Sequence, residues 1–125
     1  LLLAGHSHQE VEEKRSVSPG SVKRAVDFIH AAFDQPLTLA DIARSAGVPS
    51  RTLLDSFRRF RGTSPIRYLR DTRLDAARAA MCEGRVVTAS QAALEVGITH
   101  LGRFSKDYAE RFGETPSGTL RRAKA

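Results

Sequence analysis

One glycine-centred pattern occurs twice in this chain, and it limits the possible fold more than any other feature of the sequence. The letters ARSAGV stand at residues 43–48, and ALEVGI stands at residues 93–98. In both copies, apolar residues at helical spacing precede a glycine, which can adopt the positive φ that ends a helix. Another amphipathic segment begins a few residues later. Each copy therefore predicts a helix, a tight turn and a second helix, which is the helix-turn-helix motif.

The first unit carries suitable residues at each helix end. Thr38-x-x-Asp41 has the spacing of a capping box, in which side chains satisfy free backbone donors at the start of a helix. Pro49 cannot continue the helix that ends at Gly47, and Gly62 stops the second helix. We expect the buried side of that second helix to consist of Leu53, Phe57 and Phe60.

The second unit repeats these signals. Thr88-x-x-Gln91 has the same capping spacing at the start of its first helix. Residues 113–116, GETP, correspond to residues 62–65, GTSP, in which a glycine ends one helix and a proline opens the next. The expected buried side of its second helix consists of Leu101, Phe104, Tyr108 and Phe112.

Two further helices precede and join these units. Apolar residues at positions 22, 26, 29 and 33 predict an amphipathic helix over 21–33, packed across the first helix-turn-helix. A long helix is expected over residues 65–82, spanning about 27 Å at about 1.5 Å per residue. Its candidate buried residues are Ile66, Leu69, Leu74, Ala77 and Met81. The pattern as a whole predicts an all-α fold, with two helix-turn-helix units joined by a long linker helix.

The exposed faces of the two second helices indicate what the units bind. These faces carry Arg51, Leu54, Asp55 and Arg58 in the first unit, and Thr99, Gly102, Arg103, Lys106 and Glu110 in the second. A short cationic helix face can enter the major groove of B-DNA, where arginine donates two hydrogen bonds to guanine. One such face alone is equally well explained as solvated charge. Cations on the same face of both units favour DNA, because a purely structural role does not require this repetition.

Glycine at an exposed position inside a helix needs its own explanation. Gly102 costs about 1 kcal/mol relative to alanine at such a site. It either admits the close approach of another surface or is simply tolerated.

Composition narrows the class of partner. The chain has 125 residues, a formal charge of +6 and a pI near 10.2. This charge favours a polyanion such as nucleic acid, and disfavours a membrane surface because the basic residues are spread over several helices. The single cysteine, Cys82, excludes an internal disulfide and fits a reducing cytoplasm. No apolar run is long enough to cross a membrane.

The first twenty residues are expected to differ from the rest. The chain begins with LLLAG and not with methionine, so we expect residues 1–20 to hold the end of a missing N-terminal domain and a flexible linker. His6 and His8 have a spacing found in some metal sites, but no third ligand follows nearby, and a solvated linker is the preferred interpretation. No catalytic or metal site and no cofactor is predicted.

Two longer runs carry a family resemblance. The run GVPSRTLLDSFRRFRGTSPIRYLRDTRLDAAR, followed by ALEVGITHLGRFSKDYAERFGETPSGTLRR, resembles the C-terminal DNA-binding domain of AraC/XylS-type transcription regulators, closest to the XylS branch. The match covers about residues 22–122. It implies a seven-helix fold with two homeodomain-like helix-turn-helix subdomains, at 21–63 and 85–125, bridged by a linker helix at 64–84. It also implies a bacterial, cytoplasmic and nucleoid-associated regulator.

The resemblance also implies a set of DNA contacts. The family's base-reading positions fall on Arg51, Leu54, Asp55 and Arg58 in the first unit, and on His100, Gly102, Arg103, Lys106 and Asp107 in the second. Leu54 and Asp55 depart from the polar or basic residues that the family often has there. Phosphate contacts are expected from Ser50, Arg59, Arg61 and Thr63, with Lys106 in addition.

Three classes of function follow for comparison. The preferred one is a sequence-specific regulator that binds double-stranded DNA and contacts RNA polymerase, with a small-molecule effector bound only by the missing N-terminal domain. The alternative is a helical protein–protein interaction module with only non-specific affinity for DNA. An enzyme is disfavoured because the sequence has no phosphate loop, nucleophile motif or metal spacing.

Overall fold

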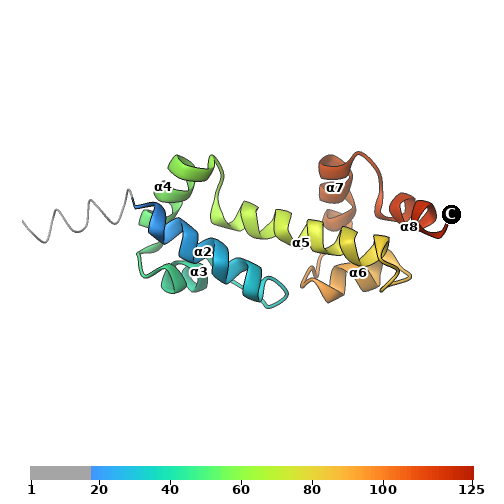
Figure 1. Ribbon diagram of the computed structural model, residues 1–125, viewed down its shortest axis with the longest axis horizontal. Helices are drawn as coiled ribbons and strands as arrows, with labels where there is room; N and C mark the ends of the chain where they lie inside the picture. The colour runs from blue at the N-terminus through green and yellow to red at the C-terminus, as the bar shows by residue number, and fades with distance from the viewer. Residues whose placement is uncertain (1–17) are drawn as a thin grey trace, which may run out of the picture. The chain divides into compact units, whose positions relative to one another are not determined.

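The computed structural model describes residues 18–125, and over that range the chain is all-α, as predicted, with seven helices and no strand (Figure 1). The helices are α2 (Pro19–Ala32), α3 (Leu39–Ala46), α4 (Ser50–Arg61), α5 (Pro65–Cys82), α6 (Ala89–Glu95), α7 (Leu101–Phe112) and α8 (Pro116–Lys124). The predictions for residues 1–17, including the histidine pair and most of the linker, lie outside the described residues.

The described residues form two compact units. The N-terminal unit comprises residues 18–32 and 37–69, which hold α2, α3, α4 and the beginning of α5. The C-terminal unit comprises residues 33–36 and 70–125, which hold the rest of α5 together with α6, α7 and α8. Residues 33–36 of the connection between α2 and α3 thus belong to the C-terminal unit, although they lie between two helices of the N-terminal one.

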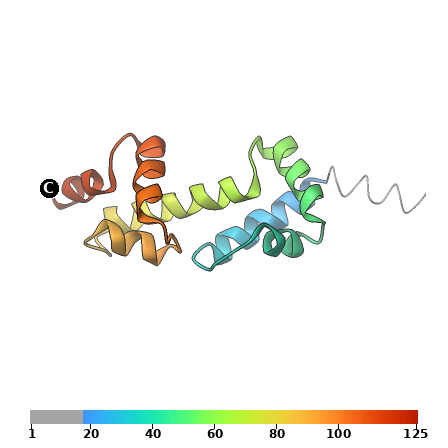
Figure 2. The same cartoon turned by 180° about the vertical axis from the view of Figure 1, so that it is seen from behind.

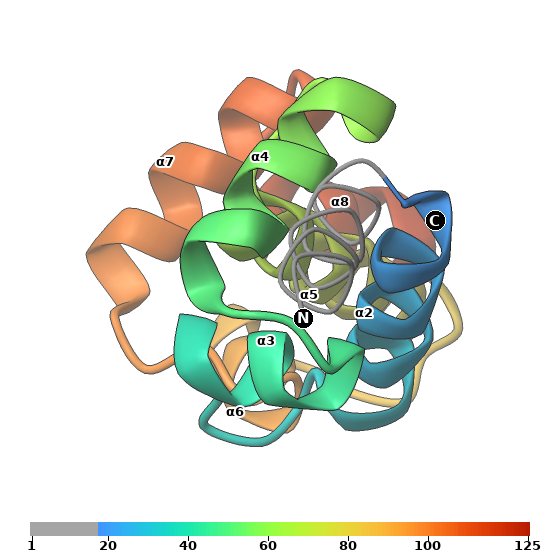
Figure 3. The same cartoon turned by 90° about the vertical axis from the view of Figure 1, so that its left-hand side faces the viewer.

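The N-terminal unit packs α2, α3 and α4 around one apolar core (Figure 3). Its completely buried side chains include Ala25, Ile29, Ile42, Ala46, Leu53 and Phe57. The predicted capping box is present, because the Asp41 N–H donates to Thr38 Oγ1 at 3.1 Å and the Thr38 N–H donates to Asp41 Oδ2 at 2.9 Å. Gly47 ends α3 with a φ of +73°. This confirms the predicted first turn.

The core of the C-terminal unit lies between α5, α6 and α7, and α7 stands across the direction of α6 (Figure 2). Its buried members include Leu74, Ala77, Met81, Ala92, Ala93, Phe104 and Tyr108. The second capping box is also present, since the Gln91 N–H donates to Thr88 Oγ1 at 3.1 Å. Gly113 ends α7 with a φ of +74°.

Phe33 lies elsewhere than expected. Helical spacing placed it on the face of 21–33 that packs across the first helix-turn-helix, but it follows the end of α2 and packs against the core of the C-terminal unit. Arg73 of α5 holds this connection, donating to the Phe33 carbonyl at 2.7 Å and the Gln35 carbonyl at 2.8 Å. Gly97 lies against it, since a Cβ there would come within 2.8 Å of the Asp34 carbonyl oxygen. A side chain at position 97 is therefore excluded both by this contact and by a φ of +85°.

Three residues expected on buried faces are partly exposed. Phe60, Ile66 and Leu101 keep 41%, 44% and 44% of their surface accessible. Phe60 lies in the last turn of α4, while Ile66 and Leu101 lie in the first turns of α5 and α7. Helical spacing predicts which face is apolar but not where along a helix the neighbouring elements stop covering it, so residues in terminal turns were wrongly assigned to the core.

Candidate nucleic-acid interface

The exposed side of α4 carries most of the base-contacting residues predicted for the first unit. Arg51, Asp55 and Arg58 are exposed, and Leu54 is half-buried. The opposite side buries Leu53, Ser56 and Phe57. This burial keeps the exposed side of α4 turned away from the core, where its guanidinium groups can meet another molecule.

Basic side chains gather at the C-terminal end of α4. Arg58, Arg59 and Arg61 occupy its last turn, where positive charge is favourable beside the free carbonyl groups. The Arg59 guanidinium lies 5.9 Å from the centre of the Phe60 ring, and that of Arg61 lies 5.4 Å from the Tyr68 ring. Both arginines are exposed. Each guanidinium is therefore held near an aromatic ring while it stays open to solvent.

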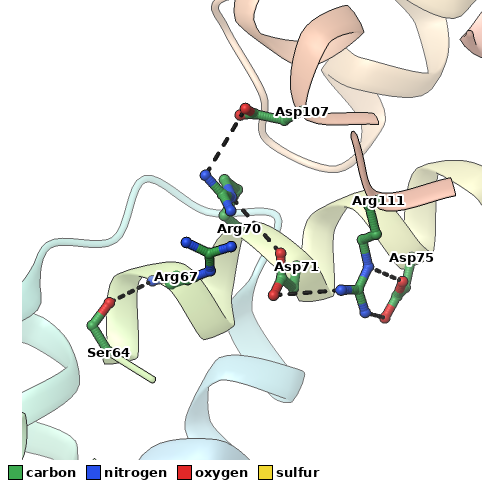
Figure 4. Close-up of polar contacts among 7 residues, drawn as sticks. All are labelled: Ser64, Arg67, Arg70, Asp71, Asp75, Asp107 and Arg111. Carbon is green, nitrogen blue, oxygen red and sulfur yellow. Dashed lines mark hydrogen bonds and ion pairs between the residues drawn. The ribbon is translucent and has the colours of Figure 1, made fainter. Parts of the chain in front are cut away.

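Ser50 and Thr63, the phosphate contacts predicted near helix starts, differ in the groups that a phosphate could reach. Ser50 is the first residue of α4 and is half-buried. The Thr63 hydroxyl oxygen is buried and has no hydrogen-bond partner, so a phosphate contact at Thr63 depends on its backbone. Ser64 next to it caps α5, accepting the Arg67 N–H at 3.1 Å (Figure 4).

In the second unit His100 has a definite structural task. It is the N-cap of α7, and its Nδ1 accepts the Arg103 N–H at 3.0 Å. A ring nitrogen that accepts cannot carry a proton, so the neutral ring has its proton on Nε2. Because His100 is exposed, it offers a hydrogen-bond donor to any molecule that approaches the start of α7.

The remaining predicted residues of α7 divide into an outward and an inward set. Gly102, Arg103 and Lys106 are exposed. A Cβ at Gly102 would meet only the His100 ring, at 3.5 Å, so the described structure itself has room for a side chain there. Asp107 is different, because its side chain is only 13% exposed and its carboxylate lies 3.9 Å from Arg70 Nη1 on α5 (Figure 4).

Two groups of polar residues beside α7 were missed by sequence reasoning. In the first, Arg111 donates to both oxygens of Asp75, at 2.8 and 3.0 Å, and also lies 3.5 Å from Asp71 (Figure 4). The hydrogen bond to Asp75 raises the pKa of the Arg111 guanidinium. The only sequence signal was the pair of carboxylates four residues apart in the long helix. Their partner could not be identified without the fold.

The second group joins α7 to α8. The Thr119 hydroxyl donates to Glu114, so the hydroxyl of buried Tyr108, 2.6 Å away, donates to Thr119. Arg122 Nε donates to Glu114 at 2.9 Å. The hydrogen bonds from Arg122 and then Thr119 lower the pKa of Glu114 to about 2, whereas burial raises the pKa of Tyr108. These bonds connect the end of α7 to α8.

Metal centres and membrane-spanning helices are two other kinds of feature that residues 18–125 could contain. In this range no three side chains of the types that bind metals come together, and no helix is long and apolar enough to cross a membrane. The exposed sides of α4 and α7 carry cationic groups, with Arg51 and Arg58 on α4 and Arg103 and Lys106 on α7.

Comparison with known proteins shows which family the chain resembles. The helix-turn-helix domain family matches residues 42–122. The chain is 37% identical, over 97% of its length, to the "Probable thc operon regulatory protein" of Rhodococcus erythropolis, and 36% identical, over 83% of its length, to the "XylDLEGF operon transcriptional activator" of Pseudomonas putida. It covers 37% and 33% of these proteins, about a third of the length of each.

Solved structures with the same architecture include two bacterial regulators. One is a probable AraC family transcriptional regulator from Rhodopseudomonas palustris, with a TM-score of 0.77 and 36% identity, over 82% of this chain and 96% of that one. The other is a regulator with an AraC-type DNA-binding domain from Chromobacterium violaceum, with a TM-score of 0.75 and 29% identity, over 85% of this chain and 94% of that one.

Proposed function

Because this chain belongs to the AraC/XylS family of helix-turn-helix transcription regulators, we propose that it reads specific double-stranded DNA sequences through α4 and α7. The family consists of DNA-binding regulators and not of enzymes, and we propose no catalytic role. In this proposal each helix-turn-helix subdomain, 21–63 and 85–125, places its second helix in a major groove, with 64–84 as the link between them.

One observation carries the proposal. In both units the second helix buries an aromatic residue, Phe57 or Phe104, and exposes cationic side chains on its other side. In α4 the cations are Arg51 and Arg58, and in α7 they are Arg103 and Lys106. A helix held in this way can lie along the groove floor, where a bidentate arginine–guanine contact discriminates against the wrong base by about 1–3 kcal/mol.

Each predicted contact has a proposed task. Arg51, Arg58, Arg103 and Lys106 read base edges, with His100 adding a donor from Nε2 at the start of α7. Leu54 offers an apolar contact to a thymine methyl group, and Gly102 allows α7 to come close to the bases. Asp55 is a further candidate base contact, whereas the predicted base contact of Asp107 is less favoured because its carboxylate faces Arg70 on α5. Arg59, Arg61 and the helix starts at Ser50 and Thr63 hold phosphates and position the protein without reading sequence.

The wider role follows from the relatives and is part of the proposal. The Pseudomonas putida relative is named as a transcriptional activator of an operon. Since the chain spans about a third of such proteins, we propose that it works within a longer regulator that contacts RNA polymerase and binds a small effector through another domain. Such a regulator acts at the bacterial nucleoid, in the cytoplasm.

Selection from a randomised duplex pool tests this proposal. The chain is incubated with the pool, bound duplexes are sequenced over several rounds, and affinity for the winner is measured against salt concentration. We expect a motif in two blocks about one helical turn, or about 34 Å, apart, with affinity that falls steeply as salt rises. Salt-sensitive binding without any enriched motif would contradict the proposal and favour a helical interaction module with only non-specific affinity for DNA.

A further inference from the structure

We propose that Arg111 and Asp107 are positioning residues that orient recognition helix α7 on α5 through a charged clamp formed with Arg70, Asp71 and Asp75. This inference rests on the proposed function, because it assigns a means of holding α7 in its reading position. It gives α5 a second task besides connecting the two units. All five residues belong to the C-terminal unit.

Arg111 forms the stronger half of this clamp. Its Nε lies 2.8 Å from Asp75 Oδ1 and its Nη2 lies 3.0 Å from Asp75 Oδ2, so the guanidinium and carboxylate meet through two parallel hydrogen bonds. Nη1 lies 3.5 Å from Asp71 Oδ2. A bidentate pair fixes direction as well as distance, because both groups are planar. Arg111 therefore restricts rotation of α7 about its own axis.

Asp107 forms the other half, one helical turn closer to the reading end of α7. Its carboxylate faces Arg70 at 3.9 Å, and Arg70 also lies 3.7 Å from Asp71 (Figure 4). The charges on the two helices are complementary. On α7 the acidic Asp107 precedes the basic Arg111, whereas on α5 the basic Arg70 precedes the acidic Asp71 and Asp75. This order fits one register of α7, because a shift by one turn would bring like charges together.

The position of the clamp links it to base reading. Arg103, Asp107 and Arg111 follow one another at intervals of four residues, so any rotation of α7 about its axis moves all three together. The two clamped residues hold the later turns of the helix, and Arg103 extends from its first turn. A rotation of α7 allowed by a broken clamp would move the Arg103 guanidinium away from the two guanine atoms that it must reach together.

A competing task for Arg111 is a direct phosphate contact, and the two tasks predict different measurements. A phosphate contact would lower affinity for all DNA and reduce the dependence of affinity on salt. A positioning residue would leave the salt dependence unchanged and reduce the ratio of affinities for the selected site and for a scrambled duplex.

The test compares Asp75→Asn with Asp27→Asn. Both variants remove one negative charge and one ion pair, since Asp27 pairs with Lys23 at 2.9 Å on the exposed side of α2. The change in net charge therefore has the same effect on the DNA affinity of both variants. We expect Asp75→Asn to lower the ratio of specific to scrambled affinity about tenfold, within the range of one lost base contact, and Asp27→Asn to leave it unchanged. Equal ratios for the two variants would overturn the clamp.

Four further variants decide between the outcomes. Arg111→Lys keeps the charge but loses the bidentate geometry, so we expect a smaller loss of discrimination than with Arg111→Gln. The double variant Asp75→Arg with Arg111→Asp reverses the pair and is expected to recover discrimination relative to Arg111→Asp alone. If Arg111→Gln instead lowered the salt slope by about 0.9 and left the ratio unchanged, Arg111 would be a phosphate contact.

Failure of the clamp is distinguishable from failure of the proposed function. If the unaltered chain shows no preference for any duplex, the proposed function fails and the clamp fails with it. If the unaltered chain discriminates and the Asp75 and Arg111 variants, folded by circular dichroism, discriminate equally well, only the clamp is wrong. Should Asp75→Asn fail to fold, the milder Arg111→Lys gives the deciding ratio.

Discussion

Arg103 is the side chain whose loss should be most visible in sequence preference. It is exposed in the first turn of α7, and its own N–H is held by the His100 cap. We expect Arg103→Ala to weaken binding to the selected site by about 1–3 kcal/mol and to relax the preference at one base pair. Titration against duplexes substituted at each position checks this. Unchanged affinity and preference would mean that α7 does not read bases as proposed.

Arg59 should behave differently because it is expected to hold phosphate. It is exposed in the last turn of α4, beside the Phe60 ring. Arg59→Ala should weaken binding to selected and scrambled duplexes equally and lower the slope of log affinity against log salt by about 0.9. Affinities of both duplexes at several salt concentrations measure the effect. A loss confined to the selected duplex would assign base reading to Arg59.

His100 combines a cap with a proposed contact, and two substitutions separate them. His100→Ala removes the acceptor for the Arg103 N–H and should lower the free energy of unfolding by about 1 kcal/mol, whereas His100→Asn can still cap. Denaturant unfolding measures this difference. If Asn also alters DNA preference without altering stability, the Nε2 donor contacts DNA. Equal stability of the Ala variant and the unaltered chain would contradict the cap.

For single residues, the sequence predicted which side of a helix a side chain occupies better than it predicted which neighbouring groups that side chain meets. Angular counting on one helix identified the exposed cations of α4 and α7, because helical geometry alone decides which side a residue occupies. It did not reveal that Asp107 faces Arg70, or that the Thr63 hydroxyl is buried. Both depend on neighbouring turns or helices, about which the spacing within one helix carries no information.

At the scale of the helices, the contact between α7 and α8 should depend on pH. The pKa of Glu114 is about 2 in the folded chain, below its ordinary 4.5, because Arg122 and Thr119 donate hydrogen bonds to its carboxylate. A depressed pKa stabilises the fold above pH 4.5, and this contribution is lost as the pH falls toward about 2. We therefore expect the melting temperature to fall over that interval.

Glu114→Gln and Glu110→Gln form a matched pair for this test. Glu110 is an exposed carboxylate of α7. The melting temperature, measured by circular dichroism from pH 6 to pH 2.5, should fall less on acidification in Glu114→Gln than in the unaltered chain. Glu110→Gln should follow the unaltered chain. If all three fell in parallel, the Glu114 carboxylate would not be the group responsible.

Helix existence and helix ends were largely predictable, because they depend on local chemistry. The capping boxes at Thr38 and Thr88, and the positive φ of Gly47 and Gly113, follow from residue type and spacing. The coverage of terminal turns was not predictable, so Phe60, Ile66 and Leu101 are more exposed than expected. Their exposure depends on how far the neighbouring elements extend, which is a property of the packed unit.

For the whole molecule, the repeated helix-turn-helix pattern was the sequence feature that best predicted the fold, but it did not predict the position of residues 33–36. The two copies of the motif correctly predicted a fold with two helix-turn-helix motifs. The copies did not indicate that residues 33–36, between the first two described helices, belong to the C-terminal unit. These residues are held there by the packing of Phe33, by hydrogen bonds from Arg73 and by the close approach of Gly97. A sequence repeat predicts the elements that both units share. The contact of residues 33–36 occurs in one unit only, so the repeat could not predict it.

We propose that one chain reads two neighbouring segments of a duplex together. Inserting about five base pairs between the two selected blocks turns one block to the opposite side of the helix, since a turn has about 10 base pairs. We expect affinity to fall to that for a duplex with one block, and to recover in part when about ten base pairs are inserted. Affinity that is unchanged by the half-turn insertion would contradict it, because the two units would then not be reading their blocks together.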